Sequence, residues 1–211
     1  MQGGRRMRYM VDLYSGLGGA SESMIKDKSW SVLRIDNNPL LSDVPNTIID
    51  DVPSLVGKVK TRSGFTRIDL IWASPPCTEF SGGFQSPKSI ASRKNPGLSD
   101  YKPNMKLVEA AKTIIDTVQP KYWVIENVIG SIRYIKEILG EPRQIIGPYA
   151  LWGNFPYIGL DKAAIIPKKY KDTNGHDPLR ANRRAKVDLL LSMRLKEAIE
   201  NQKSILDYTS S

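Results

Sequence analysis

The sequence is short of the residues that build disulfides and metal sites, with one cysteine, Cys77, and one histidine among 211 residues. A lone cysteine excludes an internal disulfide and fits a reducing compartment, so we expect a cytoplasmic protein. One Cys with one His does not make a Cys/His zinc site, and no metal is expected. No apolar run approaches the ~20 residues that cross a membrane. The basic start has no apolar signal core, so we expect no secretory peptide.

Acidic residues are also in deficit: 22 Asp and Glu stand against 31 Lys and Arg, which gives a net charge of +9. A basic balance favours a polyanionic partner, because cations that contact phosphate release counterions. A merely basic, soluble surface would give the same total. The distribution favours the partner, since eight Lys and Arg but only two Asp lie between Lys162 and Lys186. We expect residues 1–8 to be a flexible leader and residues 9–211 to form one domain.

Strand and helix patterns alternate along the chain. This alternation predicts an α/β fold, a mostly parallel sheet with helices on both faces. The expected strands are 9–14, 30–35, 47–50, 68–73, 121–128 and 144–151, with a further strand in 160–166. The expected helices are 21–28, one that begins at 51–53, 105–118, 129–139 and 187–199.

A glycine turn, Ser15–Ala20, follows the first strand and precedes a helix, as in cofactor-binding α/β units. It lacks the third glycine of the dinucleotide fingerprint, so a purely structural turn fits as well. Asp36 ends the second strand 20 residues after Gly16, where an acidic side chain can accept ribose hydroxyls. A turn-forming Asp36-Asn37 pair explains it equally well. Asp51 is either a ligand or an N-cap ahead of Pro53.

The cysteine follows a strand that ends at Ser74-Pro75-Pro76, where two prolines remove backbone donors and stop the strand. Its thiol is thus expected just beyond a strand's carboxyl end, where α/β proteins bind ligands. A lone Cys is usually a buried small hydrophobe, but this one lies outside the apolar run. Glu126 ends the fifth strand, so its carboxylate is expected near Cys77 unless it only caps a helix.

A long polar segment, residues 82–104, separates the cysteine strand from the next helix. Its prolines predict no regular structure, and its basic side chains predict a mobile lid that closes over a polyanion. Residues 157–186 form a second polar and basic excursion.

Three segments occur in a fixed order: Asp12–Gly19, Pro75–Ser81 and Glu126–Val128. With them, the chain resembles the cytosine-5 DNA methyltransferases. Trp152–Pro156, and Arg184–Val187 with Ser192, resemble the short forms found in phages and other mobile elements. The resemblance implies a Rossmann-like S-adenosylmethionine-dependent methyltransferase that acts on double-stranded DNA in a prokaryotic or phage host cell.

The resemblance also implies roles for individual residues. Cys77 would add to carbon 6 of cytosine as a thiolate whose pKa positive surroundings lower, and Glu126 and the Pro76 carbonyl would hold the base. Asp36 would bind the ribose of S-adenosylmethionine and Asp51 its adenine amino group. The implied cofactor contacts are Tyr14, Ser15, Gly16, Leu17, Gly18, Asp36, Asn37, Asp51, Val52 and Ser192. The implied nucleic-acid contacts are Ser81, Lys88, Arg93, Lys94 and Asn127.

The sequence departs from the family in three places. No clean Gln-x-Arg-x-Arg segment is present, and Arg183 and Arg184 are the candidates for the arginine that contacts the base. Asp188 stands where the short forms carry a proline. Residues 157–182 are too short for a target-recognition domain, so specificity should be low or supplied by a separate partner.

Three alternatives remain open at this point. The same chemistry would act on RNA in a relative of the transfer-RNA methyltransferases. The chain would otherwise be an inactive DNA- or cofactor-binding subunit, or an unrelated α/β nucleotide-binding enzyme in which Cys77 is structural.

Overall fold

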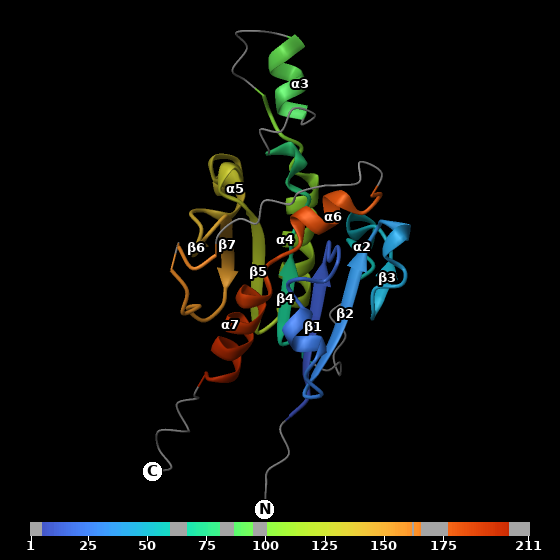
Figure 1. The fold of residues 1–211 in the computed structure, drawn as a ribbon, viewed down its shortest axis with the longest axis vertical. Coiled ribbons are helices and arrows are strands. Elements are labelled where there is room, and N and C mark those ends of the chain that lie inside the picture. Colours follow the sequence, from blue (N-terminus) through green and yellow to red (C-terminus); the bar gives the residue numbers. More distant parts are fainter. Residues whose placement is uncertain are drawn as a thin grey trace, which may run out of the picture.

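The computed structural model describes residues 6–59, 67–80, 87–94, 101–161, 163–165 and 177–202. Its centre is a seven-stranded sheet in the order β3-β2-β1-β4-β5-β7-β6 (Figure 1). The first five strands are parallel, and β7 runs antiparallel to both β5 and β6. The strands are β1 (Arg8–Leu13), β2 (Trp30–Asp36), β3 (Thr47–Ile49), β4 (Leu70–Ala73), β5 (Tyr122–Val128), β6 (Gln144–Ile146) and β7 (Tyr149–Asn154).

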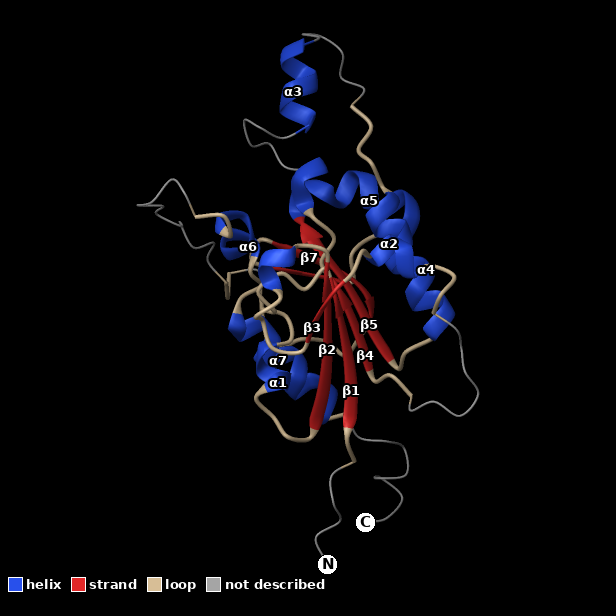
Figure 2. Cartoon of the chain, turned by 90° about the vertical axis from the view of Figure 1, so that its right-hand side faces the viewer, coloured by secondary structure: helices blue, strands red, loops and turns tan. Residues whose placement is uncertain are grey.

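Helices cover both faces of the sheet, as expected for parallel strands. Figure 2 shows α1 (Glu22–Ile25) and α7 (Leu189–Glu200) on one face and α2 (Val52–Leu55) and α4 (Lys106–Val118) on the other. All four residues of β4 are buried, so this strand packs on both faces. The remaining elements are α3 (Pro87–Lys94), α5 (Ile132–Leu139), α6 (Arg180–Ala185) and the 3₁₀ helices η1 (Pro39–Leu41), η2 (Cys77–Glu79) and η3 (Ile129–Ser131). The predicted α/β fold is confirmed.

Several predicted elements differ from the structure. The single strand predicted at 144–151 is a hairpin of β6 and β7, which turns at Gly147 with φ +53°. The strand predicted in 160–166 is wrong for the described residues 160, 161 and 163–165, none of which is in a strand. Within the segment predicted to be irregular, α3 is a helix that begins at Pro87, a position where proline's missing N–H costs no hydrogen bond. The basic excursion contains a further helix, α6.

The sheet order reverses at β1, because β2 and β3 lie to one side and β4 and β5 to the other. Such a reversal leaves a crevice at the carboxyl ends of the two central strands, here β1 and β4. The glycine turn follows β1, Cys77 follows β4, and α6 lies beyond the same ends (Figure 1). None of the described helices is long and apolar enough to cross a bilayer. No cluster of three potential metal ligands occurs within the described ranges.

Candidate active site

The glycine turn after β1 is held in a conformation that glycine makes possible. Gly16 and Gly18 have φ values of +51° and +69°, which L side chains disfavour. The Gly18 amide donates to the Ser15 carbonyl at 2.7 Å, and the Gly16 amide donates to the Asp36 carboxylate at 2.8 Å. Asp36 therefore joins the turn to the end of β2. A carboxylate has about four acceptor positions, so Asp36 can still accept hydroxyls from a ligand.

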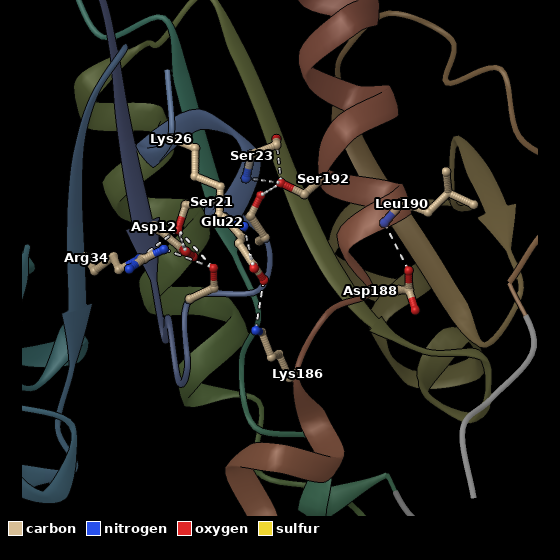
Figure 3. A network of polar contacts seen from close by, with 12 residues as sticks. Asp12, Ser21, Glu22, Ser23, Lys26, Arg34, Lys186, Asp188, Leu190 and Ser192 are labelled. Carbon is tan, nitrogen blue, oxygen red and sulfur yellow. Dashed lines mark hydrogen bonds and ion pairs between the residues drawn. The ribbon is translucent and has the colours of Figure 1, made fainter. Parts of the chain in front are cut away.

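Arg34, which the sequence reasoning missed, lies beneath this turn (Figure 3). Only 4% exposed, it donates to the Gly18 carbonyl at 3.1 Å, to Ser21 Oγ at 2.9 Å and to the Pro45 carbonyl at 3.1 Å. A Cβ on Gly18 would lie 2.3 Å from Arg34 Cζ, so a side chain there would displace the guanidinium, and the φ of +69° also disfavours other residues. An arginine inside an otherwise apolar strand was the available signal.

Asp12 completes the network around Arg34. Ser21 Oγ donates to Asp12 Oδ2 at 2.6 Å, while Asp12 Oδ1 is buried without a partner among the described residues. Burial raises the pKa of Asp12 to about 6, although Ser21 and Arg34 both lower it. The hydroxyl of Ser15 is a second buried polar atom for which the described chain provides no partner. The turn and the end of β1 therefore contain two buried polar atoms without a hydrogen-bond partner among the described residues.

The two aspartates that follow β3, Asp50 and Asp51, have different roles. Asp50 Oδ1 accepts from the Asp51 amide at 2.8 Å and from Ser54 Oγ at 3.1 Å, so Asp50 stabilises the start of α2. Asp51 occupies the N-cap position, but its side chain makes no capping bond. Its carboxylate accepts from Asn37 Nδ2 at 3.4 Å and remains partly exposed. Asp51 is therefore available to a ligand, which the N-cap interpretation did not anticipate.

The side chains of two other predicted cofactor residues, Tyr14 and Val52, make contacts within the fold. The hydroxyl of Tyr14 donates to the Leu107 carbonyl of α4 at 2.9 Å. Burial raises the pKa of Tyr14, and the nearby Asp51 raises it further. Val52 is 1% exposed and packs in the core with Leu13. These side chains hold the turn and α2 against the sheet. Leu17 is half-buried within the turn.

Ser192 requires a correction. Its hydroxyl donates to the Ala20 carbonyl at 2.7 Å and accepts from the Ser23 amide at 3.1 Å, and the two serine hydroxyls lie 2.7 Å apart (Figure 3). One donor and one acceptor position of the hydroxyl are thus used within the fold. Ser192 is 1% exposed, and its hydroxyl ties α7 to the residues of the glycine turn and α1. Asp188, in place of the proline of the short forms, caps α7 through the Leu190 amide at 2.9 Å.

The segment before α7 packs on the glycine turn. A Cβ on Gly19 would lie 2.4 Å from the Val187 carbonyl oxygen, so Gly19 has no room for a side chain. Asn38 donates to Asn182 of α6 at 3.3 Å, and Lys186 pairs with Glu22 of α1 at 2.8 Å. These contacts place α6 over the end of β2.

Cys77 begins η2 and is partly buried. Burial raises the pKa of its thiol, the Glu126 carboxylate raises it further, and Arg184 lowers it. The prediction that positive surroundings would lower this pKa therefore fails in this arrangement, because burial outweighs Arg184. Pro76, just before Cys77, is exposed.

Glu126 lies on β5 beside the Cys77 segment. Ala73 of β4 pairs with Ile125 of β5, which puts Ser74 next to Glu126. Glu126 is 8% exposed, and burial raises its pKa to about 7 although a hydrogen bond from Ser74 lowers it. Trp72 Nε1 donates to Ser74 Oγ at 2.7 Å. Ser74 thus accepts from Trp72 and also acts on the Glu126 carboxyl.

Asn127 also requires a correction. Expected to contact nucleic acid, it is 1% exposed, and its Nδ2 donates to the Pro75 carbonyl at 2.9 Å. This buried bond links β5 to the loop that carries Cys77. Asn127 is a positioning residue.

The structure distinguishes the two candidate arginines on α6. Arg183 Nε donates to Asp177 Oδ2 at 2.8 Å. Arg184 is exposed, and its charge acts on the Cys77 thiol. Of the two arginines, Arg184 is the one whose charge lowers the pKa of the Cys77 thiol.

The predicted lid residues lie partly on α3. Lys88, Arg93 and Lys94 are in this helix, which stands away from the sheet beyond the strand carboxyl ends (Figure 1). Ser81 lies outside the described residues. Glu79 accepts from the Tyr101 hydroxyl and from the Asn104 amide, the latter at 3.0 Å. Glu79 thus connects η2 to the residues before α4.

The geometry fits a nucleoside cofactor that carries a ribose and an adenine. Asp36 and Asp51 stand at adjacent strand ends beside a turn with positive-φ glycines, and two buried polar atoms there lack partners. Carboxylates at these two strand ends can accept hydrogen bonds from ribose hydroxyls and from an adenine amino group.

Comparisons with solved structures give distant likenesses only. A putative DNA modification methyltransferase encoded within a prophage (E. coli) is 17% identical with a TM-score of 0.40, over 61% of this chain and 34% of that one. A SAM dependent methyltransferase from Archaeoglobus fulgidus is 14% identical with a TM-score of 0.35, over 59% and 46%. The 16S rRNA methylase RmtB is 13% identical with a TM-score of 0.39, over 69% and 54%. These likenesses are too weak to carry a functional argument. The chain spans about a third of the prophage-encoded protein.

The family comparison is decisive. No curated protein matches the sequence. The family model for C-5 cytosine-specific DNA methylases matches residues 9–136, more than half of the chain. The matched region contains the glycine turn, Cys77 and Glu126. The protein therefore belongs to the C-5 cytosine-specific DNA methylase family, whose methyl donor is S-adenosylmethionine.

Proposed function

We propose that this chain transfers a methyl group from S-adenosylmethionine to carbon 5 of cytosine in DNA, through a covalent bond between Cys77 and the base. The observation that carries the proposal is the placement of Cys77 and Glu126 at the carboxyl ends of adjacent strands, close enough for one charge to shift the other's pKa. The buried bond from Asn127 to the Pro75 carbonyl fixes the two segments relative to each other.

The chemistry begins at Cys77. Its thiolate adds to carbon 6 and forms an S–C bond, and the electron pair of the C5–C6 double bond makes carbon 5 nucleophilic. Carbon 5 would then take the methyl group of the donor, whose bond to the sulfonium sulfur breaks and leaves a neutral thioether. Loss of its proton to solvent and cleavage of the S–C bond restore the aromatic ring and the thiolate.

Glu126 assists as an acid. With a pKa near 7, a large fraction of this buried carboxyl is protonated at neutral pH. A protonated carboxyl can donate to ring N3, which neutralises the charge that develops as sulfur adds to carbon 6. Arg184 favours the thiolate by lowering the pKa of Cys77.

The cofactor supplies an electrophilic methyl group when bound. Asp36 would hold its ribose hydroxyls, Asp51 its adenine amino group, and the backbone of Gly16–Gly18 its remaining polar atoms. The Arg34 network holds the turn in shape before binding, so little ordering is needed at that moment.

The target base has to leave the duplex to reach Cys77, at a cost of roughly a few kcal/mol. We expect the basic side chains of α3 and α6 to offset part of this cost. Because residues 157–182 are too few for a recognition domain, we propose that specificity is short, or is supplied by a separate partner.

The test is methyl transfer from labelled S-adenosylmethionine to matched duplex DNA and RNA. We expect labelled DNA with the wild type, a loss of label with Cys77→Ala, and a strong reduction with Glu126→Gln. Label on RNA alone would select the RNA enzyme. Binding of cofactor and DNA without transfer would instead identify an inactive subunit. Retention of activity in Cys77→Ala would refute the nucleophile.

A further inference from the structure

A hollow with basic walls lies beside both catalytic segments. Its lining residues lie just after η2, on α3, on η3, on α5 and just after α5. They include Phe80, Lys88, Ile129, Arg133, Lys136 and Glu141. None of these residues is explained by the cofactor site or by the Cys77–Glu126 pair.

The hollow is positively charged, with three cations and one carboxylate. Among the ion pairs of the described chain, none involves Lys88, Arg133 or Lys136. Arg133 and Lys136 are both exposed and, at positions i and i+3 of α5, lie on one side of that helix. The Arg133 guanidinium lies over the ring of Tyr134, 4.5 Å from its centroid, a contact that leaves its N–H groups free to donate. Unpaired cations around a hollow suit an anionic group.

The position of the hollow indicates which anion. Phe80 lies three residues after Cys77, and Ile129 lies three residues after Glu126. A strand whose cytosine reaches the Cys77–Glu126 site has a phosphate about every 3.4 Å along the duplex, so phosphates next to the target pass close to these walls. Ile129 is 47% exposed and offers apolar surface that a deoxyribose can cover.

We propose that this hollow binds the backbone phosphates of the DNA strand next to the target cytosine, with Arg133 and Lys136 as the principal contacts and Lys88 closing the opposite side. The inference rests on the proposed DNA methyltransferase function and assigns the path of the strand past the active site. Phosphate contacts carry no base information. The hollow therefore contributes affinity and orientation, and no sequence preference.

The experiment compares charge-removing variants on two surfaces. The double variant Arg133→Gln with Lys136→Gln removes the two positive charges that α5 contributes to the hollow. The matched control, Lys28→Gln with Lys121→Gln, removes two exposed cations that precede β2 and β5, at the opposite ends of the strands. Arg133→Lys with Lys136→Arg keeps the charge and tests whether the fold of α5 survives substitution. Duplex binding is measured by fluorescence anisotropy from 50 to 200 mM salt, beside methyl transfer.

We expect the slope of log K against log salt, which is negative, to be shallower by about 1.8 in the hollow variant, since each phosphate contact contributes about 0.9 to its magnitude. The loss of affinity should be equal on unrelated duplexes, and the KM for DNA should rise more than kcat falls. The control and the charge-keeping variant should retain the wild-type slope. An unchanged slope in the hollow variant of an active enzyme overturns this inference alone. A wild type that neither binds nor methylates DNA overturns the proposed function and this inference together.

Discussion

The buried carboxyl of Glu126 should make the stability of the protein depend on pH. Its pKa is raised from 4.5 to about 7, chiefly by burial, so the folded state binds the proton more tightly than the unfolded state. Between these two pKa values the unfolded state is ionised while the folded state is still protonated. Below the pKa of the unfolded state, ionisation of Glu126 does not reduce the free energy of unfolding. As the pH rises above that pKa, Glu126 reduces the free energy of unfolding progressively, and the reduction reaches its full size above about pH 7.

The size of the effect follows from the shift. At 1.36 kcal/mol per pKa unit, a shift of about 2.5 units corresponds to about 3 kcal/mol at pH 8 relative to pH 4.5. Glu126→Gln replaces the carboxyl with a neutral side chain of the same shape and removes this dependence. The free energy of unfolding of the variant minus that of the wild type should thus increase by about 3 kcal/mol across this range. Asp12, which shifts in the same direction, cancels in the difference.

The assay is urea unfolding of both proteins at several pH values and constant ionic strength. Glu109→Gln, on the exposed side of α4, is the matched control for removing a carboxyl at the surface. A Glu126→Gln difference that stays flat from pH 4.5 to 8, or that falls as the pH rises, would refute the raised pKa and with it the acid role of Glu126.

Three further substitutions test the site. Arg34→Met should raise the Kd for S-adenosylmethionine at least tenfold in calorimetry and change kcat less, because charged hydrogen bonds contribute about 1.5–3 kcal/mol each. Arg34→Lys should restore part of the affinity for the cofactor. Equal losses of affinity in both variants would contradict a positioning role for Arg34. Asn127→Leu should lower the free energy of unfolding by about 1–3 kcal/mol, because a buried carbonyl loses its donor; an unchanged urea midpoint would argue against it. Arg184→Gln should raise the pKa of Cys77 and slow its alkylation by iodoacetamide below the thiol pKa, whereas Arg183→Gln should leave the rate unchanged, and the reverse pattern would reassign the arginine.

The strand-end residues were predictable because their positions depend on local pattern. The prolines after β4 fix where Cys77 emerges, and the apolar run of β5 fixes where Glu126 lies. Parallel strands then bring both to one edge of the sheet. Asp36 and Asp51 follow from the same rule.

Other residues depend on contacts between distant segments, which periodicity does not encode. Arg34 acquires its role only when the turn after β1 folds over β2. Ser192 bonds to the Ala20 carbonyl because α7 packs on α1, and Asn127 turns inward because Pro75 lies across from it. The distinction between Arg183 and Arg184 depends on the position of Asp177. The hairpin at Gly147 is different, because the Gly147-Pro148 dipeptide is a turn signal that the prediction of one strand at 144–151 passed over.

The central claim is that the Cys77 thiolate bonds covalently to the target base. Duplex DNA containing 5-fluorocytosine tests it directly. Fluorine replaces the hydrogen that carbon 5 must lose as a proton, so the S–C bond cannot be cleaved and persists after methyl transfer. With S-adenosylmethionine present, we expect a protein–DNA adduct that survives denaturation, maps to Cys77 by mass spectrometry and is absent in Cys77→Ala. An active wild type that forms no adduct, or an adduct that persists in Cys77→Ala, would contradict it.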